Sequence, residues 1–346
     1  MAYTNIDDPS AYFNTITYTH AVTPDDRAFT FDGNSDLQPD FSWIKRRDTT
    51  TSHILQDSSR GVTKYLHSDS TSADLTYSGY LKSFNTNGLT IGGGDSASNQ
   101  GSGGTGVIWA WKAGGGTTAS NSVGDIDSVV QANTDAGFAI VTYTGNGSAN
   151  QTIGHGLGAV PKMILFKNRS NAAYWYVYHV ATGNDTMTYL NLNNAAQSLS
   201  SQFSTPTTTT FNVSNENSTF SGYNTSSNTY VAYVFSDVQG YSKFGKYVGN
   251  GNANGSFVYT GFKPAFIMLK PSSAADNWII VDNKRDPSNG ANAAQKRLFP
   301  DTNGAEGTGY AVCDMLSNGF KMRATSTSWN GSDRTYIYMA FAENPL

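Results

Sequence analysis

Charged residues are scarce in this chain, and their scarcity limits its possible partners. Only 14% of the 346 residues are charged, the net charge is −4, and the lysines and arginines are scattered along the chain. Binding to a phosphate backbone needs such residues gathered on one face. We therefore expect no nucleic-acid partner.

Cysteines and long apolar runs are also lacking. Cys313 is the single cysteine, so no disulfide can form within the chain. No run approaches the ~18 apolar residues of a membrane-spanning helix, and the first residues lack the basic and apolar regions of a secretory signal. We expect synthesis in a reducing cytoplasm and no membrane span.

Motifs of catalytic chemistry are missing as well. The chain contains no G-x-S-x-G, no H-E-x-x-H and no paired C-x-x-C. The Gly-rich stretch 152–159 is followed by Pro161 and a strand-like run instead of a helix, which excludes a phosphate-binding loop. No loop gathers the carboxylates of a calcium site, and spacing selects no carboxylate pair for glycoside hydrolysis. The sequence predicts a non-enzyme without metal or cofactor.

Glycine and aromatic residues are abundant instead. The chain has 35 Gly, 20 Tyr and 18 Phe, and no stretch repeats its apolar residues every 3.6 positions. Turn-forming and strand-forming residues of this kind favour β-sheets joined by long loops. We predict an all-β protein.

One pattern occurs three times and divides the chain. A proline opens an apolar run and a lysine closes it six residues later, in 39–45, 161–167 and 264–270. Eight residues past the lysine stand His53, Trp175 and Trp278, and twelve past it stand Asp57, His179 and Asp282. The identical spacing indicates an internal repeat.

Flanking motifs extend each copy to a unit of roughly 100 residues, a usual domain size. Tyr143–Gly147 matches Tyr247–Gly251, with Tyr18–Thr19 as a degraded first copy, and an aromatic run closes each unit. We predict three tandem β-sandwich domains, jelly-roll or lectin-like, at residues 16–113, 138–240 and 241–346.

Two further segments complete this division. Residues 114–137 are rich in Gly and Ser, which predicts a flexible or extended linker, and the short connection 237–243 predicts a closer relation between the second and third domains. Residues 1–15 form an N-terminal arm, interpreted either as an ordered lead-in to the first domain or as an attachment arm for a larger assembly.

Local patterns predict individual hairpins. Phe41–Ile44 and Ile54–Leu55 are expected to pair antiparallel, and the Asn-Gly dipeptides at 87–88 and 318–319 favour tight turns. Residues 92–106 are nearly all small or polar, which predicts a flexible loop.

Two acid and arginine pairs are candidate ligand-binding residues. Asp57 precedes Arg60, and Asp282 precedes Arg285, by three positions after a strand. Each pair either braces its own loop or binds a polar ligand or a divalent ion, and the absence of converging carboxylates does not support the ion. Ligand binding is a hypothesis for all four residues.

Tryptophans offer a second kind of candidate. Most aromatic residues of the chain are interpreted as packing in the core or on a sheet face. The remainder, with Trp175 and Trp278 as candidates, could act as flat contact surfaces for sugars or proteins, where aromatic side chains are favoured. His53 shares their repeat position, so we do not expect it to be a catalytic base. Cys313 is expected to be a buried, inert thiol.

The chain resembles a known family in four motifs, Asn5–Phe13, Tyr143–Gly147, Gly154–Gly158 and Pro161–Arg169. It is similar to the repeat-bearing virion proteins of tailed phages of marine bacteria, including cyanophages and phages of alphaproteobacteria. The resemblance covers nearly the whole chain and implies a structural or adsorption protein with β-rich domains. It implies no catalytic residues.

These observations predict a virion protein made in the host cytoplasm and displayed on the particle as a tail fibre, tail tip or head decoration. Repetition of a binding module raises avidity, which suits adsorption to a host surface. The expected partners are other virion proteins, a host glycan and further copies of the chain, for which a trimer is one arrangement. A lectin-like carbohydrate-binding protein is the alternative, and a glycan depolymerase is the third.

Overall fold

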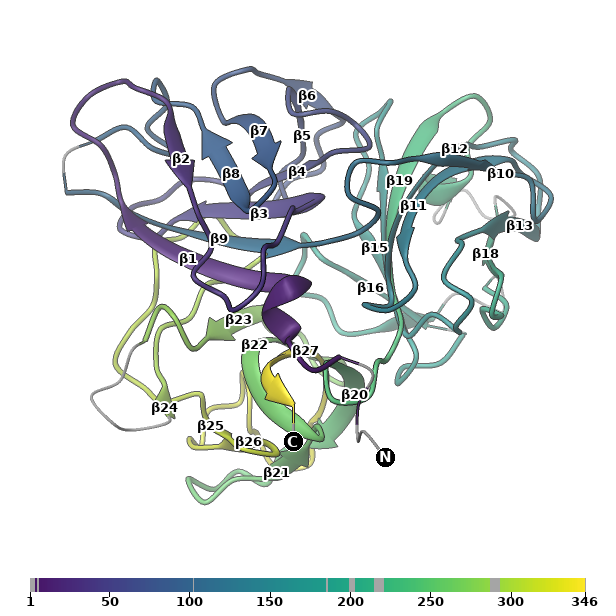
Figure 1. The fold of residues 1–346 in the computed structure, drawn as a ribbon. Coiled ribbons are helices and arrows are strands. Elements are labelled where there is room, and N and C mark those ends of the chain that lie inside the picture. The colour runs from purple at the N-terminus through teal and green to yellow at the C-terminus, as the bar shows by residue number, and fades with distance from the viewer. Residues whose placement is uncertain are drawn as a thin grey trace.

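The protein is built from β-strands. The computed structural model describes residues 4, 6–101, 103–184, 186–198, 203–214, 221–286 and 293–345. Within these ranges the chain forms strands and two 3₁₀ helices, and no α-helix. The all-β prediction is confirmed. The strands fall into three groups along the chain, which occupy three lobes around a common centre (Figure 1).

The first unit contains strands β1 to β9, preceded by the 3₁₀ helix η1 (Pro9–Ala11). Its strands are β1 (Phe13–Thr19), β2 (Arg27–Phe29), β3 (Phe41–Arg46), β4 (Ile54–Asp57), β5 (Lys64–Tyr65), β6 (Leu75–Thr76), β7 (Leu81–Asn85), β8 (Gly88–Ile91) and β9 (Thr105–Trp111).

The second unit contains strands β10 to β19 and the 3₁₀ helix η2 (Ser221–Tyr223). Its strands are β10 (Ala119–Asn121), β11 (Ser128–Asn133), β12 (Phe138–Thr144), β13 (Gln151–Gly154), β14 (Met163–Asn168), β15 (Tyr176–His179), β16 (Thr186–Tyr189), β17 (Gln197–Ser198), β18 (Thr210–Val213) and β19 (Thr229–Phe235).

The third unit contains strands β20 to β27. Its strands are β20 (Ser242–Val248), β21 (Phe257–Tyr259), β22 (Phe262–Pro271), β23 (Ile279–Asp282), β24 (Ala293–Ala294), β25 (Cys313–Leu316), β26 (Gly319–Met322) and β27 (Thr335–Pro345).

The main sheets of the three units share one strand order. The first unit has β1-β9-β3-β4 and the third has β20-β27-β22-β23, while β12-β19-β14-β15 forms the middle of an eight-stranded sheet in the second. All these neighbours are antiparallel. In each case the proline-opened strand lies beside the closing aromatic strand. A smaller sheet accompanies each main sheet, with orders β2-β8-β7, β13-β18 and β21-β26-β25-β24.

Three predicted hairpins are confirmed. Ile44 is opposite Ile54 in the pair β3 and β4. Strands β7 and β8 pair across the turn before Gly88, and β25 and β26 pair across the turn before Gly319. An added Cβ at Gly88 or Gly319 would meet a backbone oxygen of the neighbouring strand at 1.8 or 2.1 Å. The close approach of that strand therefore requires glycine at both positions.

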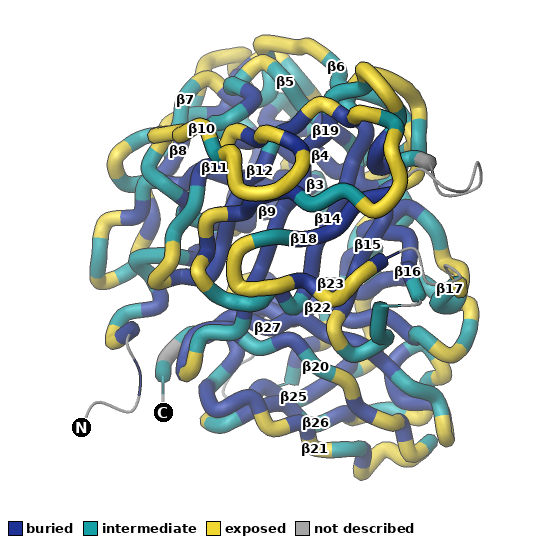
Figure 2. Tube along the Cα trace, turned by 90° about the vertical axis from the view of Figure 1, so that its right-hand side faces the viewer, coloured by how far each residue is buried: buried dark blue, intermediate teal, exposed yellow. Residues whose placement is uncertain are grey.

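Each main sheet is buried on both faces, because residues along a strand alternate between two cores. In β9, Val107, Trp109 and Trp111 belong to a central core, whereas Ile108 and Ala110 belong to the core of the first unit. The same alternation divides β19 and β27 between the central core and the cores of their own units. Figure 2 shows the buried residues along these inner strands and the exposed ones in the outer loops.

Aromatic rings of all three units meet in the central core. Phe41 of the first unit lies 4.3 Å from Tyr233 of the second, between ring centres. Phe235 of the second unit lies 6.1 Å from Phe341 of the third, and Trp111 of the first lies 5.5 Å from Phe266 of the third. The three units therefore close around one shared core.

The predicted linker, expected to be flexible or extended, forms the extended strands β10 and β11, and the flexible alternative is wrong. Its strand β11 pairs with β12 along its whole length. The amides of Gly115 and Gly116 donate to the buried carboxylate of Asp40 at 2.8 and 2.7 Å, and Gln131 Nε2 donates to Ser58 and Ser59 at 3.0 Å. Gly and Ser here serve a tight turn against the first unit, which composition alone does not distinguish from flexibility.

The second and third units are not packed more closely than the other pairs of units, although the connection between them is short. Each pair of neighbouring units shares the central core. The loop 92–106 also differs from its prediction, because Ser98 and Asn99 are fully buried.

The N-terminal segment is packed against the body where it is described. Ile6 is buried in the central core, Pro9 is buried, and Thr4 Oγ1 donates to the carbonyl of Gln239 at 2.5 Å. Residues 1–3 and 5 of the predicted arm lie outside the described residues. From Thr4 and Ile6 onward, the ordered lead-in is the interpretation that fits, and Phe13 already begins β1.

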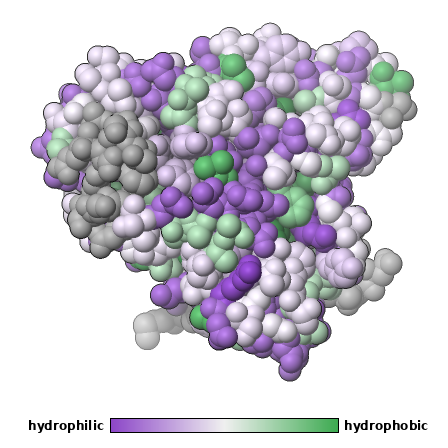
Figure 3. Space-filling view, turned by 180° about the vertical axis from the view of Figure 1, so that it is seen from behind, coloured by the Kyte–Doolittle hydropathy of each residue, from purple (hydrophilic) through white to green (hydrophobic). Residues whose placement is uncertain are grey.

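The surface is mixed in polarity. On the face drawn in Figure 3, hydrophilic and weakly hydrophobic residues alternate over short distances. No helix in the described parts of the chain is long and apolar enough to cross a membrane.

Candidate functional site

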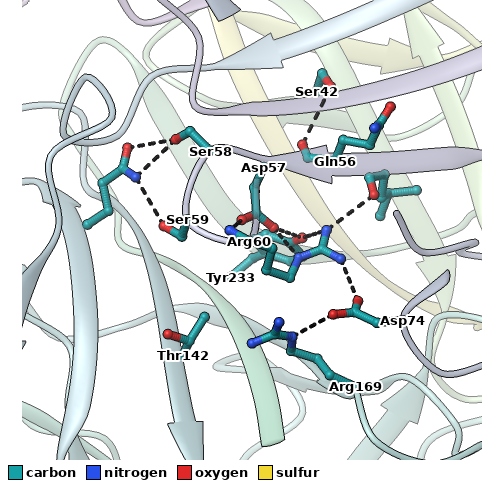
Figure 4. Close-up of polar contacts among 12 residues, drawn as sticks. Ser42, Gln56, Asp57, Ser58, Ser59, Arg60, Asp74, Thr142, Arg169 and Tyr233 are labelled. Atoms are coloured by element: carbon teal, nitrogen blue, oxygen red, sulfur yellow. Dashed lines mark hydrogen bonds and ion pairs between the residues drawn. The ribbon is translucent and has the colours of Figure 1, made fainter. Parts of the chain in front are cut away.

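The predicted pair Asp57 and Arg60 lies in the seam between the first and second units (Figure 4). Arg60 Nε donates to Asp57 Oδ2 at 2.5 Å, and the Arg60 amide donates to Asp57 Oδ1 at 2.8 Å. From the neighbouring unit, the Tyr233 hydroxyl donates to Asp57 Oδ2 at 2.7 Å. Both charged side chains have no exposed surface. The pair braces its loop, as one of the two interpretations predicted, and also joins two units.

Further charges continue this network toward the surface. Arg60 Nη1 lies 2.7 Å from Asp74 Oδ1, and Arg169 Nε of the second unit lies 2.7 Å from Asp74 Oδ2. Burial by itself would lower the pKa of Arg60, but the charges of Asp57 and Asp74 raise it, so Arg60 stays charged. The buried charges are thus compensated within the protein.

The seam between the third and first units repeats the arrangement. Arg285 Nε donates to Asp282 Oδ2 at 2.5 Å, and Trp109 Nε1 of the first unit donates to the same oxygen at 2.9 Å. Glu306 connects Arg285 to Arg47 of the first unit, at 3.2 and 2.8 Å. Trp109 therefore takes the place that Tyr233 has in the other seam.

The third seam explains why the repeat position of these aspartates holds His179 in the second unit. The closing strand facing it belongs to the third unit and has Met339 where the others have Trp109 and Tyr233, as the strand registers show. The Met339 side chain has no N–H or O–H to donate. His179 instead bonds the Tyr338 carbonyl through Nε2 at 3.1 Å, and burial lowers its pKa to about 4, so the ring is neutral. A buried aspartate at this position would lack a donor from the neighbouring unit to compensate its charge, and the neutral His179 avoids this cost.

The tryptophans of the repeat are seam residues too. Trp175 and Trp278 are 0% and 1% exposed. Trp175 Nε1 donates to the His67 carbonyl of the first unit at 2.8 Å, and Trp278 Nε1 donates to the Tyr189 carbonyl of the second at 2.7 Å. His53 makes the matching contact through Nε2 to the Phe299 carbonyl of the third unit at 3.0 Å. Neither tryptophan offers a face to a ligand, which corrects the prediction of flat surface contacts.

The lysine of each repeat is fully buried and reaches into the neighbouring unit. Lys167 Nζ donates to the Thr71 carbonyl at 2.9 Å, Lys270 Nζ to the Asn193 carbonyl at 3.3 Å, and Lys45 Nζ to the Asn303 carbonyl at 3.5 Å. Burial lowers the pKa of all three lysines to about 8.

Backbone hydrogen bonds confirm that the seams are equivalent. The amides of Thr51, Ala173 and Asp276 donate to the same three carbonyls, of Asn303, Thr71 and Asn193, at 2.9, 2.9 and 2.8 Å. The three units therefore contact one another in a closed ring, and most residues that recur in the sequence serve its seams.

The recurring Tyr and Asn-Gly motif anchors outer loops. The Tyr143 hydroxyl donates to the Tyr223 carbonyl at 2.6 Å, and the Tyr247 hydroxyl donates to the Trp329 carbonyl at 2.6 Å. An asparagine follows each of these accepting residues and forms a hydrogen bond with the Asn-Gly turn. In the third unit, Asn330 Nδ2 donates to Asn250 Oδ1 at 3.1 Å. Tyr18 holds the Ser98 carbonyl in the same way in the first unit.

Two cavities lie at equivalent places beside these anchored loops. The one in the third unit measures about 480 Å³ and is lined by Asp276, Ser328 and Trp329 among others. The one in the second unit measures about 450 Å³ and is lined by Ala173 and Gly222, which have the same repeat positions as Asp276 and Ser328. Unlike the buried seams, these cavities reach the surface: Tyr310 and Tyr174 are 68% and 43% exposed. They are the candidate functional sites.

Sequence reasoning missed both cavities, because their walls come from loops that differ between the units. The signal that was available is the anchoring motif itself, since a loop held at a fixed place by Tyr and Asn can present different residues. Cys313 is buried as predicted, and burial raises the pKa of its thiol. No group of three or more His, Cys, Asp or Glu that could hold a metal ion occurs among the described residues.

Comparison with known proteins identifies a family without a known function. A family model described as a domain of unknown function, DUF7483, matches residues 8–345. No curated protein and no solved structure matches the chain. The family model spans all three units as one domain, in agreement with their shared core. The chain belongs to the DUF7483 family.

Proposed function

We propose that this protein is a non-enzymatic structural protein of a phage particle that is displayed on the particle surface and contributes to adsorption to the host. A tail fibre, a tail tip and a head decoration are the positions that this role allows. The proposal starts from the resemblance of the motifs at 143–147, 154–158 and 161–169 to marine phage virion proteins.

One structural observation supports it most strongly. The residues that recur in all units are used in the seams and loop anchors, whereas the loops around the two outer cavities differ between units. A rigid body that presents variable loops at repeated positions suits recognition of a surface, because several weak contacts act together.

The finer description of the fold belongs to the same proposal. We interpret each unit as a β-sandwich in which the main sheet packs on its smaller sheet, so the chain is three tandem sandwiches closed into a ring. Attachment to other virion proteins and assembly into a homo-oligomer complete the role. Mass measurement of the purified protein in solution tests the oligomer.

The location on the particle tests the role directly. Gold-labelled antibody against this chain is applied to intact particles of a phage that encodes it. Label over the head supports a decoration protein, and label at the tail supports adsorption. Intact particles that contain the protein by immunoblot and bind no label would contradict surface display.

A lectin-like carbohydrate-binding protein is the second candidate, favoured by the exposed tyrosines of the two cavities. A glycan array incubated with the purified chain tests it, and loss of the signal on replacing Tyr174 or Tyr310 supports it.

A further inference from the structure

The cavity of the third unit contains an arginine without an acidic partner. The guanidinium of Arg297 lies 5.4 Å from the ring centre of Trp329, and its Nη1 makes a long hydrogen bond of 3.4 Å to the Thr308 carbonyl. No carboxylate lies within ion-pair distance of Arg297 among the described residues. Partial burial lowers the pKa of Arg297, although the group stays charged. An uncompensated guanidinium in a cavity is a ready partner for an oxyanion.

Asp276, the acidic residue of this cavity, interacts with groups other than Arg297. Asp276 accepts the Asn277 amide at 2.9 Å through Oδ1, and its Oδ2 lies 3.9 Å from Arg334 Nη1. The Asp276 carboxylate thus has a cation of its own, and Arg297 is left with positive charge to offer.

The remaining walls suit a sugar ring. Tyr310, which is 68% exposed, provides aromatic surface on which the C–H face of a pyranose can pack. Ser326, Ser328 and Asn277 add hydroxyl and amide groups that can bond to sugar hydroxyls. The cavity volume of about 480 Å³ lies in the range of small-ligand sites.

The equivalent cavity of the second unit has a different chemistry. Tyr174, Asn171 and Asn228 line it, and no charged residue is among its described walls. A preference for anionic ligands is therefore expected in the third unit only.

We propose that the cavity of the third unit binds a saccharide unit that carries an oxyanion, a carboxylate or a sulfate. Arg297 pairs with the oxyanion, and Tyr310 contacts the face of the ring. This inference deepens the proposed function by naming the ligand class of adsorption, and it rests on that function for its biological role. Binding itself is measured on the isolated chain, so the two can fail separately.

Calorimetric titration of the full chain with three short oligosaccharides tests the proposal. The probes are oligogalacturonate, a sulfated galactose oligomer and the uncharged galactose oligomer of the same length. We expect at least one anionic probe to bind about tenfold or more tightly than the uncharged one, and the stronger of the two identifies the oxyanion. Equal affinity for all three, or no binding of any, would overturn the proposal.

Variants locate the site. Arg297→Gln is expected to remove the preference for the anionic probe, and Tyr310→Ser to weaken all binding severalfold. Arg323→Gln is the matched control, because Arg323 is a partly exposed arginine of the same unit that pairs with Asp314 at 2.7 Å outside the cavity. An unchanged preference in Arg297→Gln, or the same loss in Arg323→Gln, would contradict the assignment. Tyr310 is exposed, so its variant remains informative if Arg297→Gln fails to fold.

Discussion

Removal of one hydroxyl group at the seam of the first and second units should destabilise the whole protein. In Tyr233→Phe, Asp57 loses a donor at 2.7 Å and Arg60 Nη2 loses an acceptor at 3.0 Å. Asp57 keeps its contacts to Arg60, so its charge stays paired. Hydrogen bonds to charged groups contribute roughly 1.5–3 kcal/mol each, and we expect a loss of about 2 kcal/mol in the free energy of unfolding.

Urea unfolding followed by tryptophan fluorescence measures this loss, with the slope of the transition unchanged. Tyr174→Phe is the control, because Tyr174 is 43% exposed. A double-mutant cycle with Asp57→Asn should show a coupling energy above about 0.5 kcal/mol. A loss in Tyr233→Phe no greater than in Tyr174→Phe would refute the claim that this contact stabilises the ring.

The remaining predictions concern the other repeat positions. His179→Asp should lower the free energy of unfolding by about 3–5 kcal/mol, because the new charge would be buried without a donor. Met339→Tyr in the same chain should restore part of this loss. A mild effect of His179→Asp in urea unfolding would contradict this account of the repeat position. The pKa of the three buried lysines falls from the ordinary 10.5 to about 8, so the unfolded chain holds more protons between these values and stability should rise with pH there. We expect the free energy of unfolding to rise by an amount of the order of 1 kcal/mol per lysine between pH 8 and pH 9.5. In Lys167→Met the total rise should be smaller by a third. A free energy of unfolding that stays constant over this pH range would show that the lysines are not desolvated. Asn330→Ala should lower the free energy of unfolding by about 1–3 kcal/mol in urea, since the two N–H groups of Asn330 Nδ2 are shared among three oxygens within 3.1 Å. Asn171→Ala, at an exposed position, should be nearly neutral.

The sequence was sufficient to predict three hairpins and the proline-opened and closing strands, because these depend on neighbours along the chain. Asp57 and Arg60 were also recognisable as a pair, since three positions separate them. Their partners Tyr233 and Asp74 could not be predicted, because the contacts exist only once the units close into a ring. The same holds for Trp175 and Trp278. Their aromatic rings suggested a contact surface for a ligand, but their ring N–H groups donate to carbonyls of a neighbouring unit.

One trace of the ring was present in the sequence. The repeat position of Asp57 varies as Asp, His and Asp, and the closing strands that face these residues carry Tyr, Met and Trp in the same order. The aspartates coincide with Tyr or Trp, and the histidine with Met, only when the residue of one unit is compared with the closing strand of the neighbouring unit. This comparison requires knowing which unit lies beside which in the ring. The linker was misjudged for a related reason, because Gly115 and Gly116 are fixed by Asp40 of the first unit and not by their own segment.

Calorimetry tests most directly the claim that the three units form one body around a shared core. For 346 residues the heat of unfolding should be about 240 kcal/mol at ~0.7 kcal/mol per residue. A single cooperative unit gives a van't Hoff enthalpy equal to this heat, and this is the result that we predict under conditions of reversible unfolding. A van't Hoff enthalpy near one third of the measured heat, about 80 kcal/mol, would mean that the units unfold independently and would contradict the account.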